Sequence, residues 1–213
     1  MTKIKSKDYH DYVIKNGKFI GKFEQMYKNI KDPWFHGNAE SISYDIALYL
    51  IDKFGICSKA EKILDIGCGK GAFIHRIKKQ CPKVKILAVD ISPTAIKKAR
   101  AVYGKDNISF EVMDIQKGYK NIKEKFDLIV LSNIMWYILY DFEKIVNYLK
   151  NNLKNNGYLL IRQAFYKPGQ QKYGNSIVCT PEDMVKLLKY QLVEIIELNR
   201  RSNYEAIVLL KNR

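Results

Sequence analysis

The residues best suited to bind a ligand lie in a glycine-rich segment, residues 63–71, which reads ILDIGCGKG. An apolar run ends at Asp65 and Ile66, and Gly67, Gly69 and Gly71 follow it before an amphipathic stretch begins. Glycine lets the backbone turn tightly and lets a ligand approach without meeting a Cβ atom. A strand, a glycine loop and a helix in this order therefore predict a binding site where the strand ends.

Acidic residues near this loop indicate what kind of ligand it takes. Asp90 ends the following apolar run, KILAVD, at the place where an acid binds ribose hydroxyls in dinucleotide-binding folds. The glycine spacing is G-x-G-x-G, tighter than the G-x-G-x-x-G that sets a pyrophosphate on a helix N-terminus. Asp65 would repel a pyrophosphate but suits an ammonium group. We therefore expect a ligand with a ribose and a cationic amino-acid end, and without phosphate.

Short apolar runs alternate with amphipathic stretches from residue 61 onward, which predicts a parallel sheet with helices on both faces. The predicted strands are 62–67, 85–90, 108–113, 126–132, 157–165, 191–199 and 203–211, and the predicted helices are 72–80, 92–103, 141–154 and 181–190. The turn at 200–202 is too short for a crossover connection, so the last two strands must be antiparallel. The expected fold is an α/β sheet that is parallel except for one reversed strand near an edge.

Local signals mark several of these boundaries. Ser92 and Thr180, each followed by proline, predict helix N-termini, and Gly157 predicts the end of the helix before it. Upstream, residues 18–55 have a helical periodicity that breaks at Pro33, which predicts two helices joined by a turn.

The composition is that of a globular protein with a strongly basic balance, a net charge of +15 over 213 residues. The lysines form small groups scattered along the chain, so we favour solvated faces over a nucleic-acid-binding surface. The charge is compatible with an anionic small acceptor. The apolar runs are too interrupted for a membrane span, and the first residues lack the apolar core of a signal peptide, so we expect a cytoplasmic protein.

The four cysteines, Cys57, Cys68, Cys81 and Cys179, form no C-x-x-C pair and have no histidine at metal-ligand spacing. This pattern predicts reduced thiols rather than a disulfide framework or a zinc site. We accordingly expect no metal cofactor.

Residues 63–71, Asp90 and the later MDI and FDLIVLSNIMWYI segments resemble the successive motifs of class I S-adenosylmethionine-dependent methyltransferases. The resemblance covers about residues 61–213 and implies a Rossmann-like seven-stranded sheet in the order 3-2-1-4-5-7-6, with one antiparallel strand. We expect a single domain, with an N-terminal helical lid over residues 1–58 and the core over 59–213. The implied cofactor, S-adenosylmethionine, has the ribose, the ammonium end and the lack of phosphate expected above.

The resemblance also implies a role for each cofactor-binding position. The glycine loop would hold the methionine part, Asp90 the ribose hydroxyls and Asp114 the adenine amino group. Ile91 would pack on the adenine, and Asn133 would lie beneath the sulfonium. The residues expected at the cofactor are Asp65, Gly67, Cys68, Gly69, Gly71, Asp90, Ile91, Met113, Asp114, Ile115 and Asn133.

Acceptor residues are expected from the ends of the fourth and fifth strands and from the N-terminal lid. The candidate segments are residues 31–38, 133–141 and 162–175, which are rich in aromatic or polar side chains. His36 is the candidate general base for a hydroxyl acceptor, since imidazole titrates near neutral pH, and Tyr137 is a second candidate catalytic residue. The candidate acceptor-binding residues are Trp34, Trp136, Tyr140, Arg162 and Lys167.

The DPW turn and the SNIMWYI segment are similar to small bacterial methyltransferases of the nodulation N-methyltransferase type and to relatives in sugar and surface-glycan pathways. This similarity implies a small acceptor that is linked to a sugar or a nucleotide. An acceptor that carries phosphate is one alternative, and both oxygen and nitrogen are candidates for the methylated atom. An RNA methyltransferase is the first alternative, because the chain is strongly basic. The segment SNIM, residues 132–135, argues against it, since methylases that act on base amino groups have an Asn/Asp-Pro-Pro-aromatic tetrad after the fourth strand. A non-catalytic methyltransferase-like subunit and an NAD(P)-dependent oxidoreductase follow, and both a monomer and a homodimer stay open.

Overall fold

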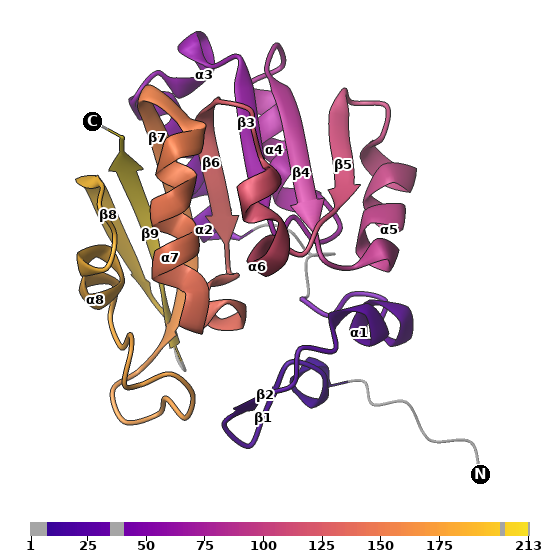
Figure 1. The fold of residues 1–213 in the computed structure, drawn as a ribbon, viewed down its shortest axis with the longest axis vertical. Helices are drawn as coiled ribbons and strands as arrows, with labels where there is room; N and C mark the ends of the chain where they lie inside the picture. Colours follow the sequence, from indigo (N-terminus) through magenta and orange to yellow (C-terminus); the bar gives the residue numbers. More distant parts are fainter. Residues whose placement is uncertain (1–7, 35–40, 201–202, 213) are drawn as a thin grey trace.

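A seven-stranded sheet forms the centre of the computed structural model, which describes residues 8–34, 41–200 and 203–212 (Figure 1). Its strands are β3 Lys62–Ile66, β4 Lys85–Asp90, β5 Ile108–Val112, β6 Phe126–Ser132, β7 Leu153–Tyr166, β8 Gln191–Asn199 and β9 Asn203–Lys211. They lie in the order β5-β4-β3-β6-β7-β9-β8, and β9 runs antiparallel to the other six strands. The predicted strand order and the predicted reversed strand are both confirmed.

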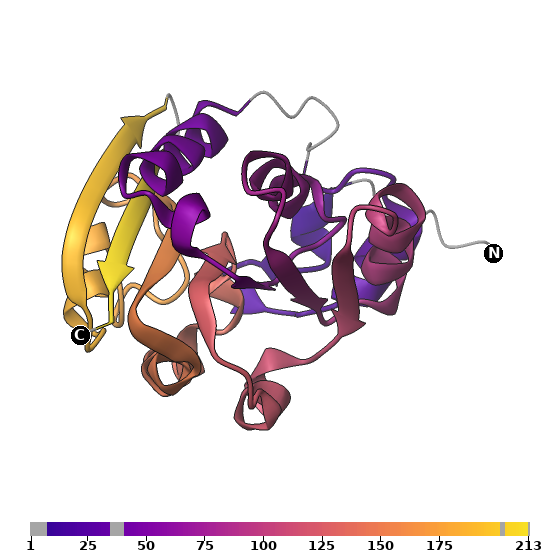
Figure 2. The same cartoon turned by 90° about the horizontal axis from the view of Figure 1, so that it is seen from above.

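Helices cover both faces of this sheet, as Figure 2 shows. The helices α2 Ile42–Lys53, α3 Ile56–Lys59, α4 Ala72–Gln80 and α5 Pro93–Tyr103 pack with one face in a shared hydrophobic cluster. The helices α6 Ile115–Gly118, α7 Phe142–Leu149 and α8 Pro181–Lys186 pack against the other face. Ser92 and Thr180 cap α5 and α8 as predicted, accepting hydrogen bonds from Ala95 N and Asp183 N. Among the described helices, none has the length and hydrophobicity that crossing a bilayer requires.

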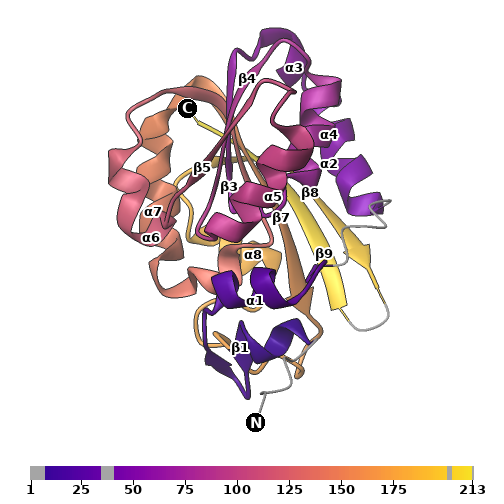
Figure 3. The same ribbon diagram turned by 90° about the vertical axis from the view of Figure 1, so that its right-hand side faces the viewer.

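The N-terminal segment lies beyond the carboxyl ends of β3, β4 and β6, as Figures 1 and 3 show. It contains the short 3-10 helix η1 Tyr9–Asp11, a hairpin of β1 Ile14–Lys15 and β2 Lys18–Phe19, and helix α1 Phe23–Asn29. The predicted pair of helices in 18–55 is therefore present as α1 and α2, preceded by a hairpin that the sequence did not indicate. Helix α2 packs on the sheet, whereas η1, β1, β2 and α1 lie over the strand ends (Figure 3).

The predicted role of Gly157 as a helix end is wrong. Helix α7 already ends at Leu149, and β7 begins at Leu153, four residues before this glycine. The pairing of β6 with β7 shifts register between Phe126 and Leu128, so β7 accommodates an irregularity that includes Asn156 at φ 63°. Gly157 fits inside this strand because a Cβ atom there would meet Asp127 O at 3.2 Å.

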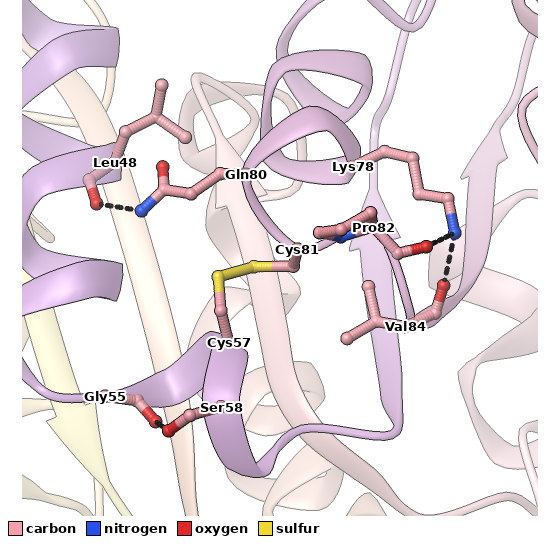
Figure 4. Close-up of a disulfide and its surroundings, with 9 residues drawn as sticks. All are labelled: Leu48, Gly55, Cys57, Ser58, Lys78, Gln80, Cys81, Pro82 and Val84. Atoms are coloured by element: carbon pink, nitrogen blue, oxygen red, sulfur yellow. Dashed lines mark hydrogen bonds between the residues drawn. A yellow bond between two sulfur atoms is a disulfide. The ribbon is translucent and has the colours of Figure 1, made fainter.

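A disulfide joins Cys57 in α3 to Cys81 at the end of α4, as Figure 4 shows, with a Cα–Cα distance of 4.9 Å. The prediction of reduced thiols is therefore wrong for this pair, while Cys68 and Cys179 are free. The spacing of the two cysteines carries no signal because they meet only after α3 and α4 have packed on the same face of the sheet. This contact is tertiary and leaves no local motif.

Reducing this disulfide is expected to lower the free energy of unfolding by about 3 kcal/mol, because the bond closes a loop with a sequence separation of 24. Urea denaturation with and without a phosphine reductant measures the change. The double variant Cys57→Ser/Cys81→Ser is the control, since its transition should be insensitive to the reductant. Equal transitions of the oxidised and reduced wild-type protein would contradict the prediction.

Candidate active site

A cavity opens at the carboxyl ends of β3, β4, β6 and β7, and residues of the N-terminal segment also line it. Among the residues predicted to bind the cofactor or acceptor, it brings together Trp34, Asp65, Gly67, Cys68, Gly69, Asp90, Ile91, Met113, Asp114, Ile115, Asn133, Tyr137 and Arg162. It also has lining residues that the sequence did not single out, namely Phe23, Tyr27, Tyr44, Ile66, Phe73, Gln116, Ser132, Ile134 and Ile138. The cavity therefore joins strand ends that are distant in sequence.

Asp90 is held between the glycine loop and the start of α5. Its Oδ2 accepts a hydrogen bond from Gly69 N at 2.8 Å, and its Oδ1 accepts one from Ser92 N at 2.9 Å. Burial raises the pKa of this carboxyl to about 6 in spite of the two hydrogen bonds. The loop itself is tied to β4 through Gly67 N and Cys68 N, which both donate to Val89 O. The parallel pairing of β3 with β4 thus places loop and acid at one edge.

Asp65 is the most deeply buried acid of the cavity, with 2% of its surface exposed. Its Oδ1 accepts no hydrogen bond from any residue that the structure describes. Burial, followed by the nearby charge of Asp90, raises the pKa of Asp65 to about 8. A buried carboxylate oxygen without a donor is costly, so a site of this kind is complete only when a cation or a donor reaches it.

The far end of the cavity is apolar with one acid at its rim. Ile91, Met113 and Ile115 line it beside Asp114, which caps α6 by accepting a hydrogen bond from Gln116 N at 3.1 Å. Apolar side chains beside a single polar group suit a flat heterocycle.

Asn133 connects the ends of β6 and β7. Its backbone has a φ of 55°, its N donates to Arg162 O at 2.7 Å, and its Oδ1 accepts from Ala164 N at 2.8 Å. The side chain thus stabilises the turn out of β6 and holds its backbone at the floor of the cavity.

Helix α1 is fastened over the cavity by polar contacts. The carboxylate of Glu24 accepts hydrogen bonds from Ser92 Oγ at 2.6 Å and from Thr94 Oγ1 at 2.7 Å. Burial opposes its ionisation, but these donors hold the pKa of Glu24 at about 2. Lys98 Nζ donates to Tyr27 O, so α5 binds α1 at a second point. This fastening is what places α1 side chains in the cavity.

Tyr27 is the residue of α1 that reaches the glycine loop. Its Oη lies 2.8 Å from the position that a Cβ atom on Gly69 would take, and it accepts a hydrogen bond from Trp34 Nε1 at 2.7 Å. Sequence reasoning missed Tyr27 and Glu24. Their spacing of three residues places both on one face of the predicted helix, but it does not show that this face packs on α5 and on the glycine loop.

An aromatic wall, made of Phe23, Trp34 and Tyr137, encloses the cavity on the side of the N-terminal segment. The ring centroids of Phe23 and Tyr137 are 5.0 Å apart, and those of Trp34 and Tyr137 are 5.9 Å apart. Burial raises the pKa of Tyr137 far above its usual range, so its phenol stays protonated. Tyr137 is thereby suited to donate a hydrogen bond and unsuited to act as a base.

Other predicted site residues lie elsewhere. Trp136 packs against Phe165 and donates to Ala164 O, Tyr140 is 77% exposed, and Lys167 lies outside the cavity lining. Gly71 is also outside the lining. His36 falls outside the described residues, as part of the segment 35–40.

Packing explains why position 71 is a glycine. Gly71 precedes α4 at φ 82°, and a Cβ atom there would come too close to the Phe110 and Tyr103 rings.

Within the described part of the chain, no group of three or more His, Cys, Asp or Glu side chains is placed to hold a metal ion.

Comparison with known proteins places this geometry in a family. A family model described as a methyltransferase domain matches residues 57–202. Malonyl-[acyl-carrier protein] O-methyltransferase of Acetivibrio thermocellus is 32% identical over 139 residues, which are 62% of this chain and 48% of that protein. Nodulation protein S of Rhizobium tropici is 29% identical over 155 residues, which are 70% of this chain and 62% of that protein. The chain thus spans about half to three-fifths of the length of these two relatives.

Among solved structures, the chain is similar to the N-methyltransferase NodS from Bradyrhizobium japonicum WM9 in complex with S-adenosyl-l-homocysteine. The TM-score is 0.67 at 20% sequence identity, covering 85% of this chain and 92% of that chain. The likeness concerns the fold, including the arrangement of the sheet.

Proposed function

The chain belongs to the methyltransferase domain family, and on that premise we propose that it transfers the methyl group of S-adenosylmethionine to a small-molecule acceptor. The observation that carries this proposal is the buried Asp65, whose Oδ1 lacks a donor among the described residues. S-adenosylmethionine has an α-ammonium group that would supply both the missing hydrogen bond and the missing positive charge. A dinucleotide would instead bring a pyrophosphate, which the same carboxylate repels.

The other lining residues fit the remaining parts of this cofactor. Asp90 would accept hydrogen bonds from the two ribose hydroxyls, since each of its oxygens has a lone pair beyond the one used by Gly69 or Ser92. Ile91 and Met113 would enclose the adenine, with Asp114 at its amino edge.

When bound, S-adenosylmethionine supplies a methyl group on a positively charged sulfur that is already activated for in-line displacement. The protein then has to position the acceptor and exclude water. The aromatic wall of Phe23, Trp34 and Tyr137 excludes water on the acceptor side, and its ring faces favour positive charge. The protonated Tyr137 phenol can hold an acceptor by donating a hydrogen bond.

The described lining contains no histidine or lysine that would take a proton from a hydroxyl acceptor. We therefore favour an acceptor that needs no strong base, a carboxylate or an amine, over a plain alcohol. The relatives include an O-methyltransferase and structural neighbours include an N-methyltransferase, so both acceptor atoms have precedent in similar proteins. His36 stays the proposed base should the acceptor be a hydroxyl.

Titration calorimetry with S-adenosylhomocysteine and with two dinucleotides tests the proposal. Above pH 8, where Asp65 is ionised, we expect S-adenosylhomocysteine to bind at micromolar concentration with a stoichiometry of about one. NAD⁺ and NADP⁺ should give no heat there, because the Asp65 carboxylate repels their pyrophosphate. Incubation with S-adenosylmethionine carrying a labelled methyl group, over a panel of small carboxylates, amines and RNA, then identifies the acceptor class. Binding of NAD⁺ but not of S-adenosylhomocysteine would overturn the proposal, and labelling of RNA alone would replace the small-molecule acceptor.

A further inference from the structure

A buried guanidinium lies in the same cavity as Asp65. Arg162 is 4% exposed, and its Cζ lies over the Tyr44 ring at 4.4 Å from the ring centroid. Tyr44 is itself stacked on Phe73 of α4 at a centroid distance of 4.6 Å. Arg162 Nε and Nη2 both donate to Ser132 Oγ, and Nη1 donates to Ser43 Oγ at 3.0 Å. These contacts hold the guanidinium in one orientation.

The positive charge of Arg162 is only partly balanced. Its acidic contact is Glu205, at 3.4 Å from Nη1, and Glu205 is shared with Arg200 at 3.2 Å. A guanidinium has five N–H groups. The second N–H of Nη2 has no hydrogen-bond partner among the described residues, since that nitrogen makes one hydrogen bond. A buried guanidinium with a long, shared ion pair and a free N–H can accept a further carboxylate.

Arg162 is the single cationic side chain in the described lining of the cavity, which otherwise carries Asp65, Asp90 and Asp114. It acts on Asp65 electrostatically, and Tyr44 feels both charges. One end of the cavity thus presents a carboxylate that lacks a donor and a guanidinium that has an N–H to give. An α-amino acid carries the complementary pair, an ammonium and a carboxylate on one carbon atom.

We infer that Arg162 binds the α-carboxylate of the methionine part of the cofactor, while Asp65 binds its ammonium. The inference rests on the proposed function, and it moves Arg162 from the acceptor site, where the sequence placed it, to the cofactor site. If an anionic acceptor occupied Arg162 instead, the cofactor carboxylate would lie at the Asp65 end of the cavity with no other described cation in the lining to offset the negative charge there.

Two ligands that differ only in this carboxylate test the inference. S-adenosylhomocysteine carries it, and decarboxylated S-adenosylhomocysteine lacks it but keeps the ammonium. In the wild-type protein, calorimetry should show tighter binding of the first. Arg162→Gln should weaken binding of S-adenosylhomocysteine by roughly 10- to 150-fold and change binding of the decarboxylated ligand by less than about 3-fold.

Two further variants guard against a folding defect. Arg162→Gln/Glu205→Gln removes both charges of the buried pair, so it should stay folded and show the same selective loss. Arg200→Gln removes the other cation bound to Glu205, lies outside the lining, and should leave both affinities unchanged.

An equal loss of affinity for both ligands in the Arg162 variants would show that Arg162 only supports the fold. Unchanged binding of S-adenosylhomocysteine, with a raised KM for the acceptor, would return Arg162 to the acceptor site. Either result overturns the inference. If the wild-type protein bound neither ligand, the proposed function itself would fail.

Discussion

Asp65→Asn is expected to weaken binding of S-adenosylhomocysteine by roughly 100-fold and, at the same time, to stabilise the ligand-free protein. Both effects come from one group. The ligand-free protein buries the Asp65 carboxyl with an oxygen that has no described donor, so its charge is unfavourable until a cation arrives. Asparagine keeps the shape and removes the charge. It therefore relieves the cost in the free protein and removes the attraction for the ligand ammonium.

The pH dependence gives this prediction a definite sign. The folded chain holds the Asp65 proton up to a pKa of about 8, because burial raises it, whereas the unfolded chain releases it near 3.8. The folded state thus binds more protons between these values, and the stability of the ligand-free protein falls as the pH rises through this window. Asp90 contributes in the same direction up to about pH 6. Between pH 6 and 8, the change in stability with pH that these two acids cause therefore comes mainly from Asp65.

Urea denaturation at pH 6 and pH 8 measures the effect. At pH 7 Asp65→Asn should raise the free energy of unfolding by about 1 kcal/mol or more. The gap between variant and wild type should widen from pH 6 to 8, by at most about 1.4 kcal/mol per pH unit. Over the same range wild-type affinity for S-adenosylhomocysteine should rise, because ionised Asp65 is the binding form.

Asp127→Asn is the matched control with the opposite sign. The Asp127 carboxylate accepts hydrogen bonds from Glu61 N and Lys62 N and pairs with Lys154. Although burial acts against it, these donors hold the pKa of Asp127 below its usual range. Its loss should destabilise the protein at neutral pH and leave ligand affinity unchanged. Destabilisation by both variants would mean that Asp65 is already satisfied in the free protein.

Much of the fold was predictable because each strand and helix carries its own local signal. The strands β3 and β6 read as continuous apolar runs since both of their faces are covered, and Ser92 and Thr180 mark helix starts by hydrogen bonds to residues three positions on. The Gly157 prediction failed because a glycine signals only a break in regular backbone geometry. Such a break occurs at an irregularity within a strand, as in β7, as well as at the end of a helix.

In the candidate site, too, the residues with a local signal were predicted and those that depend on tertiary packing were not. Asp65, Asp90 and Asp114 lie at or just beyond the carboxyl ends of β3, β4 and β5, so the topology that brings parallel strand ends together was enough to predict that they share a cavity. Trp136 and Tyr137 are adjacent in sequence, and which of them faces the cavity depends on the 3-10 turn that contains them. Tyr27 and the Cys57–Cys81 disulfide depend on packing between distant segments, which no local pattern records.

Gly67→Ala is expected to lower the free energy of unfolding by roughly 2 to 5 kcal/mol and to abolish tight binding of S-adenosylhomocysteine. Gly67 has a φ of 77°, which costs an alanine about 1–2 kcal/mol. A Cβ atom there would also lie 2.2 Å from Ile134 Cγ2, in the core cluster behind the loop. The loop would have to move away from Val89 O, to which Gly67 N donates, and the position of Asp65 would change with it.

Two substitutions separate the backbone strain from the steric clash. Gly169 has nearly the same φ, 79°, but a Cβ atom there meets nothing within 4 Å, so Gly169→Ala should cost only the backbone strain of about 1–2 kcal/mol. Ile134→Ala removes the Cγ2 atom that causes the clash. In a double-mutant cycle with Gly67→Ala it should therefore recover about 1 kcal/mol or more of the loss, relative to the sum of the single changes.

The cycle decides why this position is a glycine. A large coupling energy between positions 67 and 134 means that the end of β6 packs against the loop and requires the missing side chain. Equal costs for Gly67→Ala and Gly169→Ala, with no coupling, would mean that φ alone matters there. The sequence suggested that the glycines make room for a ligand. At Gly67 the atom that would meet a side chain belongs to the protein itself, so substitution should impair folding even when no cofactor is present.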